Sequence, residues 1–279
     1  MTVKRGYVDT EIGQIHYRSE ASGSKTPLVL FHQSAASSAM YEGLMAELAG
    51  DRPQYAPDTP GYGLSDFPPP KPSIGDYVRA ELQALDVLGV QEFHAFGFHT
   101  GASIACEMAV VAPERIRSLS LCGPPYADAD QRRQWLAKVE GAEEKRPDFE
   151  RVGVSALRLA ADGSHLLPIW QRNVDLGPDA PPAIHHRETV DNLRAGERYQ
   201  DAILAVFSQD MPALLAQVTC PILILCGDRD VLYPYLKPAC EDRPDATRVT
   251  LDGGSYVIDQ DPAQVAKELR GFLQSIETA

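Results

Sequence analysis

The sequence predicts an α/β fold, in which helices flank a mostly parallel central sheet and a helical cap is inserted into the core. Two observations lead to this prediction. Short apolar runs typical of buried strands alternate with helical patterns at both ends of the chain, which favours parallel βαβ units. The segment between them is polar and helical in pattern, with no such apolar run. We therefore expect a core in two parts, residues 1–125 and 216–279, and a helical cap over residues 126–215.

Each predicted strand is a short apolar run bounded by turn residues, and the predicted helices are amphipathic or follow directly after a strand. Ser73 precedes one of these helices and is a residue type that caps helix N-termini. Strands are expected within 27–31, 54–58, 92–98, 116–123, 220–230 and 247–255. Core helices are expected at 37–50, 73–90, 100–112 and 262–276.

The composition argues against several classes of partner. With 26 Lys and Arg against 39 Asp and Glu, the chain has a formal net charge of −13 and repels nucleic-acid backbones. No apolar run reaches membrane-spanning length, and the N-terminus lacks the apolar core of a signal peptide. The five cysteines show no C-x-x-C spacing, which is typical of buried thiols in a reducing compartment. We expect a cytoplasmic protein, monomeric or homodimeric, that acts on a small molecule and binds neither nucleic acid nor membrane.

The run Gly97-Phe98-His99-Thr100-Gly101 lies where a predicted strand turns into a helix. Its spacing is the G-x-S-x-G of a nucleophile elbow, a sharp turn that exposes a serine at the top of the sheet. Here a histidine stands at the position of the serine. We expect His99 in strained backbone, with its ring facing a cavity under the cap.

Together with four further motifs, this run resembles the α/β-hydrolase superfamily, in the branch that contains epoxide hydrolases, haloalkane dehalogenases and carbon–carbon bond hydrolases. The motifs are LVLFHQS (28–34), APDTPGYGLSD (56–66), ILCGDRDVLYP (224–234) and LDGGSYVIDQDP (251–262). They occur in the family's order. The resemblance implies the α/β-hydrolase fold and a catalytic set drawn from the elbow, the acid loop and the final loop.

The resemblance also implies that serine and histidine have exchanged places. Ser255 replaces the family's C-terminal catalytic histidine, and no histidine follows His186. Asp230 matches the family's acid position better than Asp228 does. We expect His99, Ser255 and Asp230 to project into the same cavity, with Asp230 better placed to bond Ser255 than His99.

Several roles are open for these residues. His99 can act as a general base or attack the substrate itself. We favour the base, because the N-terminal end of the following helix disfavours a protonated ring. Ser255 is then a nucleophile or orients a water molecule. The resemblance implies an oxyanion hole made by the backbone N–H of Thr100 and by a donor from Gln33 or Ser34.

Each assignment also has a plain structural alternative. An elbow without its serine occurs in proteins that bind a ligand without turnover. Ser255 is then a small loop residue, and Asp230 caps a turn. His32 occupies a structural position of the family, and no ligand spacing indicates a metal site.

We predict a hydrolase without a cofactor, acting on an ester or an activated carbon–carbon bond of a small, mostly apolar carbonyl compound. One alternative is a lyase or decarboxylase-like enzyme in which His99 only transfers protons. The other is a ligand-binding protein without catalysis. The identity of the substrate depends on cap side chains that the sequence alone does not arrange in space.

Overall fold

The computed structural model describes residues 3–144 and 159–278. Within these ranges the strands form one eight-stranded sheet in the order β1-β2-β4-β3-β5-β6-β7-β8. The pairs from β4 to β8 are parallel, whereas β1 pairs with β2, and β2 with β4, in antiparallel fashion. The strands are β1 Lys4–Thr10, β2 Gly13–Glu20, β3 Leu28–Phe31, β4 Gln54–Pro57, β5 Phe93–Phe98, β6 Ile116–Cys122, β7 Ile222–Gly227 and β8 Thr247–Leu251. The predicted α/β fold is confirmed.

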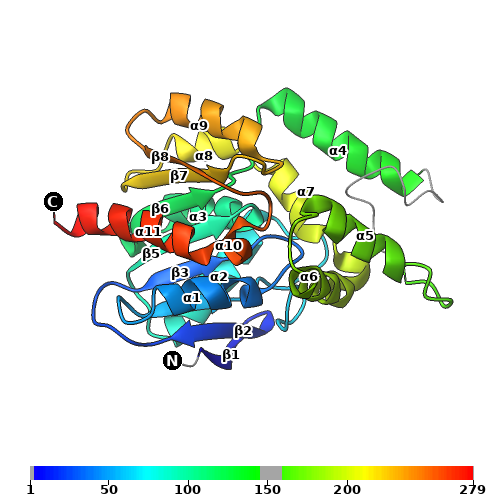
Figure 1. Cartoon of the computed structure of the whole chain (residues 1–279), viewed down its shortest axis with the longest axis horizontal. Coiled ribbons are helices and arrows are strands. Elements are labelled where there is room, and N and C mark those ends of the chain that lie inside the picture. The colour runs from blue at the N-terminus through cyan, green and yellow to red at the C-terminus, as the bar shows by residue number, and fades with distance from the viewer. Residues whose placement is uncertain (1–2, 145–158, 279) are drawn as a thin grey trace.

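Helices cover both faces of the sheet (Figure 1). One face packs against α2, α3, α8 and α9, and the other packs against α1, α10 and α11. The core helices are α1 Glu42–Glu47, α2 Ile74–Val87, α3 Thr100–Val111, α8 Met211–Leu215, α9 Leu236–Asp242, α10 Val257–Gln260 and α11 Pro262–Glu277. Ser73 caps α2 as predicted, because its side chain accepts a hydrogen bond from the backbone N–H of Asp76.

The central strands are apolar throughout because both of their faces are buried. Successive side chains of a strand point to opposite faces. In β3, Val29 and Phe31 enter the core beneath α2 and α3, whereas Leu28 and Leu30 enter the core beneath α1 and α11. The sheet is therefore a rigid platform, and the loops at the carboxyl ends of β3, β5 and β7 are held at fixed positions.

The hairpin of β1 and β2 was not predicted. Its turn closes between Thr10 and Gly13, where Gly13 has a positive φ of 122°. Val8 and Ile15 form a small separate core with Ala84 of α2. The signal was present as an alternation of apolar and polar residues on either side of a glycine turn.

The segment between β6 and β7 is helical where it is described. It contains α4 Ala129–Glu144, α5 Leu166–Leu176, α6 Pro182–Ala195 and α7 Asp201–Ser208, followed by α8 of the core face. Figure 1 shows α4 to α7 along one side of the molecule, away from both chain ends. Part of the predicted helical pattern, residues 145–158, lies outside the described residues. The domain bounds of the cap remain a prediction.

Candidate active site

His99 sits in the turn between β5 and α3, with φ 48° and ψ −108°. This backbone conformation is strained for a residue with a side chain. The two glycines of the motif make the tight turn feasible. A Cβ at Gly97 would lie 2.1 Å from the carbonyl oxygen of Gly101, and a Cβ at Gly101 would lie 1.9 Å from that of Phe31. The predicted elbow is confirmed.

The imidazole of His99 is bound by Asp230, on the turn after β7. His99 Nε2 lies 2.9 Å from Asp230 Oδ2 and 3.1 Å from Oδ1. Burial alone would raise the pKa of Asp230, but His99, together with the backbone N–H of Leu232 and the side chain of Ser255, outweighs this effect, and the pKa lies below its usual value. The expectation that Asp230 would bond Ser255 rather than His99 is therefore wrong. The elbow histidine reaches across the site to the acid directly.

This contact assigns the two ring nitrogens. An ionised carboxylate accepts hydrogen bonds, so Nε2 of a neutral His99 carries the proton and donates it to Asp230. Nδ1 then has the free electron pair, and it makes no hydrogen bond with any residue in 3–144 or 159–278. The side chain of His99 remains 15% exposed, whereas that of Asp230 is fully buried. The buried carboxylate therefore fixes the orientation of a partly exposed imidazole.

Gly123, at the end of β6, is a further residue of the site that the sequence did not single out. Its φ is +56°, and a Cβ there would lie 2.6 Å from Cδ2 and 2.8 Å from Nε2 of His99. A side chain at this position would displace the ring from Asp230. A glycine directly after a predicted strand, at the same edge of the sheet as the elbow, was the available signal.

The ring of His99 faces a cavity of about 270 Å³. The polar residues that line it, Ser34, His99 and Thr100, come from the loop after β3 and from the elbow. The remainder of the lining is apolar or aromatic and comes from the helical segment, from the turn after β6 and from the acid loop: Pro125, Trp135, Ile203, Val206, Phe207, Val231, Leu232 and Tyr235. The prediction that the His99 ring faces a cavity is confirmed.

Thr100 is the best placed donor for a developing oxyanion. It is the first residue of α3, so its backbone N–H has no partner within the helix. Its hydroxyl accepts a hydrogen bond from the backbone N–H of Ser34 at 3.3 Å and keeps its own proton to donate. The side chain of Gln33 turns away to Glu188, with Nε2 to Oε2 at 3.4 Å. Of the three predicted oxyanion residues, Ser34 and Thr100 line the cavity and Gln33 does not.

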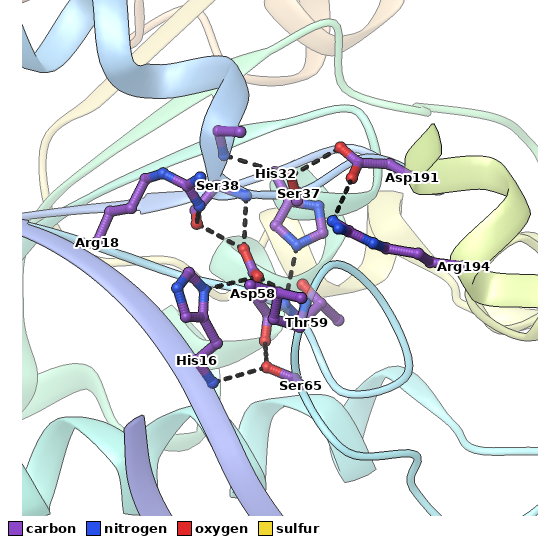
Figure 2. A network of polar contacts seen from close by, with 12 residues as sticks. His16, Arg18, His32, Ser37, Ser38, Asp58, Thr59, Ser65, Asp191 and Arg194 are labelled. Carbon is purple, nitrogen blue, oxygen red and sulfur yellow. Dashed lines mark hydrogen bonds and ion pairs between the residues drawn. The ribbon is translucent and has the colours of Figure 1, made fainter. Parts of the chain in front are cut away.

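We call residues 32–38, which follow β3, the oxyanion loop. A buried polar network holds this loop from the core side (Figure 2). Asp58 accepts hydrogen bonds from the backbone N–H and the hydroxyl of Ser38 and from His16. Nε2 of His32 accepts from the backbone N–H of Thr59, so Nδ1 donates to the carbonyl oxygen of Gln33. Both ring nitrogens of His32 are thus occupied, which confirms its structural position.

Helix α6 holds the same loop from the other side. Glu188, Asp191 and Asn192 lie three and four positions apart and therefore on one face of the helix. Asp191 accepts from the hydroxyl of Ser37 at 2.7 Å, as Figure 2 shows, and Asn192 donates to the carbonyl oxygen of Ala35 at 2.8 Å. Glu188 bonds Gln33, as described above.

Two further features are absent from residues 3–144 and 159–278. No group of three or more His, Cys, Asp or Glu side chains there is arranged to hold a metal ion. No helix in the same ranges has both the length and the apolar character needed to cross a bilayer.

Comparison with known proteins places this geometry in a family. Residues 26–262 match the family described as alpha/beta hydrolase fold. The chain belongs to the α/β-hydrolase fold family. A carboxylesterase described as uncharacterized, from Bacillus subtilis, is 24% identical over 288 residues, covering 98% of this chain and 87% of the relative. Haloalkane dehalogenase 2 of Mycobacterium tuberculosis is 25% identical over 278 residues, covering 93% and 91%.

Among solved structures, the enol-lactonase from Burkholderia xenovorans LB400 superposes with a TM-score of 0.79 at 15% identity, covering 96% of this chain and 100% of that one. This similarity shows the shared fold. The relatives and the family support the predicted enzyme class, and the chain is an α/β-fold hydrolase.

The final loop of this hydrolase differs from the prediction. Ser255 is 4% exposed and is absent from the lining of the cavity. Its hydroxyl lies close enough to Asp230 to help lower the pKa of that carboxyl. Within the described residues, however, the hydroxyl makes no hydrogen bond of ordinary geometry. The structure thus brings His99 and Asp230 together, with Ser255 beside the acid rather than beside the substrate space.

Proposed function

We propose that this hydrolase cleaves an ester, or an activated carbon–carbon bond, in a small and mostly apolar carbonyl compound, with His99 as general base toward water. The observation that carries the proposal is the contact of His99 Nε2 with Asp230, which leaves Nδ1 of this cavity-lining residue without a hydrogen-bond partner among the described residues. The carboxylesterase among the relatives and the enol-lactonase among the structures support an ester as the first substrate class to test.

The reaction needs two proton transfers. Nδ1 of His99 takes a proton from a water molecule while the water oxygen bonds to the carbonyl carbon, and the carbonyl oxygen becomes an oxyanion. The backbone N–H and the hydroxyl of Thr100 hold that oxyanion. When it collapses, the bond to the leaving group breaks, and the leaving group takes the proton from Nδ1. An ester gives an acid and an alcohol, and His99 returns to its starting state.

In this scheme Ser255 supports Asp230 and never attacks the substrate. Its burial and its absence from the cavity lining argue against a nucleophile, which must reach the carbonyl carbon. A fluorophosphonate probe should therefore leave Ser255 unlabelled. Mass spectrometry during turnover should detect no acyl group on this serine.

A lyase is the second candidate, and the same geometry favours it. His99 is bonded to a carboxylate and to no hydroxyl among the described residues, so it can transfer protons without any acyl intermediate. Assays in ¹⁸O-labelled water separate the two reactions. Hydrolysis places the label in the acid product, whereas a lyase cleaves its substrate without incorporating it.

The base is tested with His99→Gln, which keeps much of the side-chain volume but accepts no proton at this position. Neutral esters and 1,3-diketones are suitable first substrates. We expect kcat to fall by about 10²–10⁴, the contribution of a positioned base. His186→Gln is the matched control, because His186 is exposed on α6. Turnover by His99→Gln at the rate of the control would contradict the assignment.

A further inference from the structure

Most of the cavity lining is apolar or aromatic. Apart from Ser34, His99 and Thr100, its side-chain polar groups are the Tyr235 hydroxyl and the Trp135 indole N–H. Its lining residues, as far as the chain is described, include no Asp, Glu, Lys or Arg. A substrate whose carbonyl group lies at His99 therefore places the remainder of its structure in an uncharged, apolar space.

Three aromatic side chains form one wall of this space. Trp135 comes from α4, Phe207 from α7 and Tyr235 from the 3₁₀ turn at Tyr233–Tyr235. The ring centroids of Trp135 and Phe207 lie 4.9 Å apart at 46°, and those of Trp135 and Tyr235 lie 5.2 Å apart at 78°. We call these three residues the aromatic wall. A further ring packed on it gains the edge-to-face and offset contacts that aromatic groups prefer over aliphatic ones.

The electrostatics of the site disfavour an anion. Asp230 is buried directly behind His99, and its lowered pKa keeps it ionised at neutral pH. A carboxylate in the cavity would lose its hydration and meet no lining cation to compensate. The volume of about 270 Å³ lies below the range of pockets that hold drug-sized ligands. The cavity therefore favours a small, uncharged ligand over an anion.

We propose that the substrate carries an uncharged aromatic ring, which binds against the aromatic wall while its carbonyl group lies at His99. This rests on the proposed function for the position of the carbonyl group. The binding of the ring itself does not depend on catalysis.

The two tryptophans of the chain allow a direct test. Trp170 lies on α5 and does not line the cavity, so Trp170→Phe leaves Trp135 as the sole tryptophan reporter. Fluorescence titration and ligand-observed NMR then compare phenylacetamide, phenylacetate and cyclohexylacetamide, which are similar in size. We expect phenylacetamide to bind at least about tenfold more tightly than the anion. It should bind about two- to tenfold more tightly than the cyclohexyl compound.

A second variant in the same background locates the ring. Phe207→Leu keeps the reporter and should weaken phenylacetamide about two- to tenfold, whereas Phe67→Leu should leave its affinity unchanged. The Phe67 ring is 46% exposed beneath Arg198 and outside the cavity lining. The proposal would be overturned if phenylacetamide did not bind, or if it bound no more tightly than either comparison ligand. It would also be overturned if Phe207→Leu and Phe67→Leu lost the same amount of affinity for phenylacetamide. Hydrolysis of aliphatic esters without ring binding would refute this inference alone, and ring binding without hydrolysis would refute only the proposed function.

Discussion

The oxyanion loop is held from two sides, and the two sides differ in the state of their carboxylates. On the core side, Asp58 accepts four hydrogen bonds, from His16, from Leu64 and twice from Ser38. Burial alone would raise the pKa of Asp58, but these partners and His32 lower it to about 2. Asp58 is therefore ionised at neutral pH, and the core-side contact is a fixed negative charge there.

On the α6 side, the carboxylates have raised pKa values. Burial raises the pKa of Glu188 to about 7, although Arg187 opposes this, and burial also raises the pKa of Asp191. The oxyanion loop thus contacts Asp58, which stays charged, on the core side, and Glu188, which titrates near neutral pH, on the α6 side. A buried carboxylate is fixed in its charge only when donors surround it, and α6 provides fewer donors than the core does.

The largest expected effect comes from removing the core-side charge. Asp58→Asn places an amide N–H where the carboxylate accepts bonds, so buried donors lose their partner. We expect the free energy of unfolding to fall by about 4 kcal/mol. The pKa of Asp58 is depressed, so its stabilising effect is full above about pH 4 and is lost as pH falls toward 2.

Urea unfolding at pH 7 and at low pH checks this prediction. The wild-type protein should lose stability in acid more steeply than Asp58→Asn. A loss below about 1 kcal/mol at pH 7 would show that the network contributes little.

The second prediction concerns a buried carboxylate with weak support from donors. Glu81 of α2 is fully buried, and its oxygens have no hydrogen-bond partner of ordinary geometry within the described residues. Burial raises its pKa to about 8 from a usual 4.5, although the nearby Thr59 side chain opposes this. Stability linked to this group is therefore full below about pH 4.5 and falls as pH rises to about 8.

Glu81→Gln removes the titration and should stabilise the protein by on the order of 3 kcal/mol at pH 8, with little effect at pH 4. Chemical unfolding across this pH range is the measurement. The same gain at both pH values would show that the change acts through packing and not through the charge.

The third prediction tests the titrating support on α6. The pKa of Glu188 is raised, so its linked stability falls as pH rises from about 4.5 to about 7 and is constant above that. Glu188→Gln should remove this slope, which we expect to be on the order of 3 kcal/mol for the difference between a pKa of about 7 and the usual 4.5. Glu241→Gln, on the surface of α9, should leave the slope in place. An unchanged slope in Glu188→Gln would assign it to another group.

The smallest effect is expected for a neutral contact of α6. Asn192→Ala removes the hydrogen bond to the carbonyl oxygen of Ala35 and the one that Asn192 Oδ1 accepts from Asn173, and it should cost about 2 kcal/mol of stability. If α6 orients the oxyanion loop, kcat should fall by a few-fold while KM stays near its wild-type value. His186→Ala, at an exposed position of the same helix, serves as the control. A change in KM alone would favour a role in substrate binding.

The parts of the molecule that the sequence predicts well depend on contacts between near neighbours in the chain. The elbow at His99 was predictable because Gly97 and Gly101 must approach each other closely within a single turn. The central strands were predictable because both of their faces are buried and therefore apolar. The hairpin of β1 and β2 carried an alternating pattern of the same kind and was missed.

The contacts that were not predicted join residues far apart in the sequence. The pairing of His99 with Asp230 depends on the distance between the elbow and the turn after β7. The spacing of the motifs along the sequence does not give that distance. The aromatic wall joins positions 135, 207 and 235 through the arrangement of the helical segment. Its residues carry no motif, since each is an ordinary apolar position of its own element.

The single carboxylate behind His99 also limits how such a protein can evolve. Asp230 supports one imidazole, and Gly123 leaves room for that ring. A histidine introduced at position 255 alone would compete with His99 for one acid. A serine introduced at position 99 alone would leave the acid with no imidazole. Neither single change restores a serine, a histidine and an acid in the usual order, so the two positions must change together.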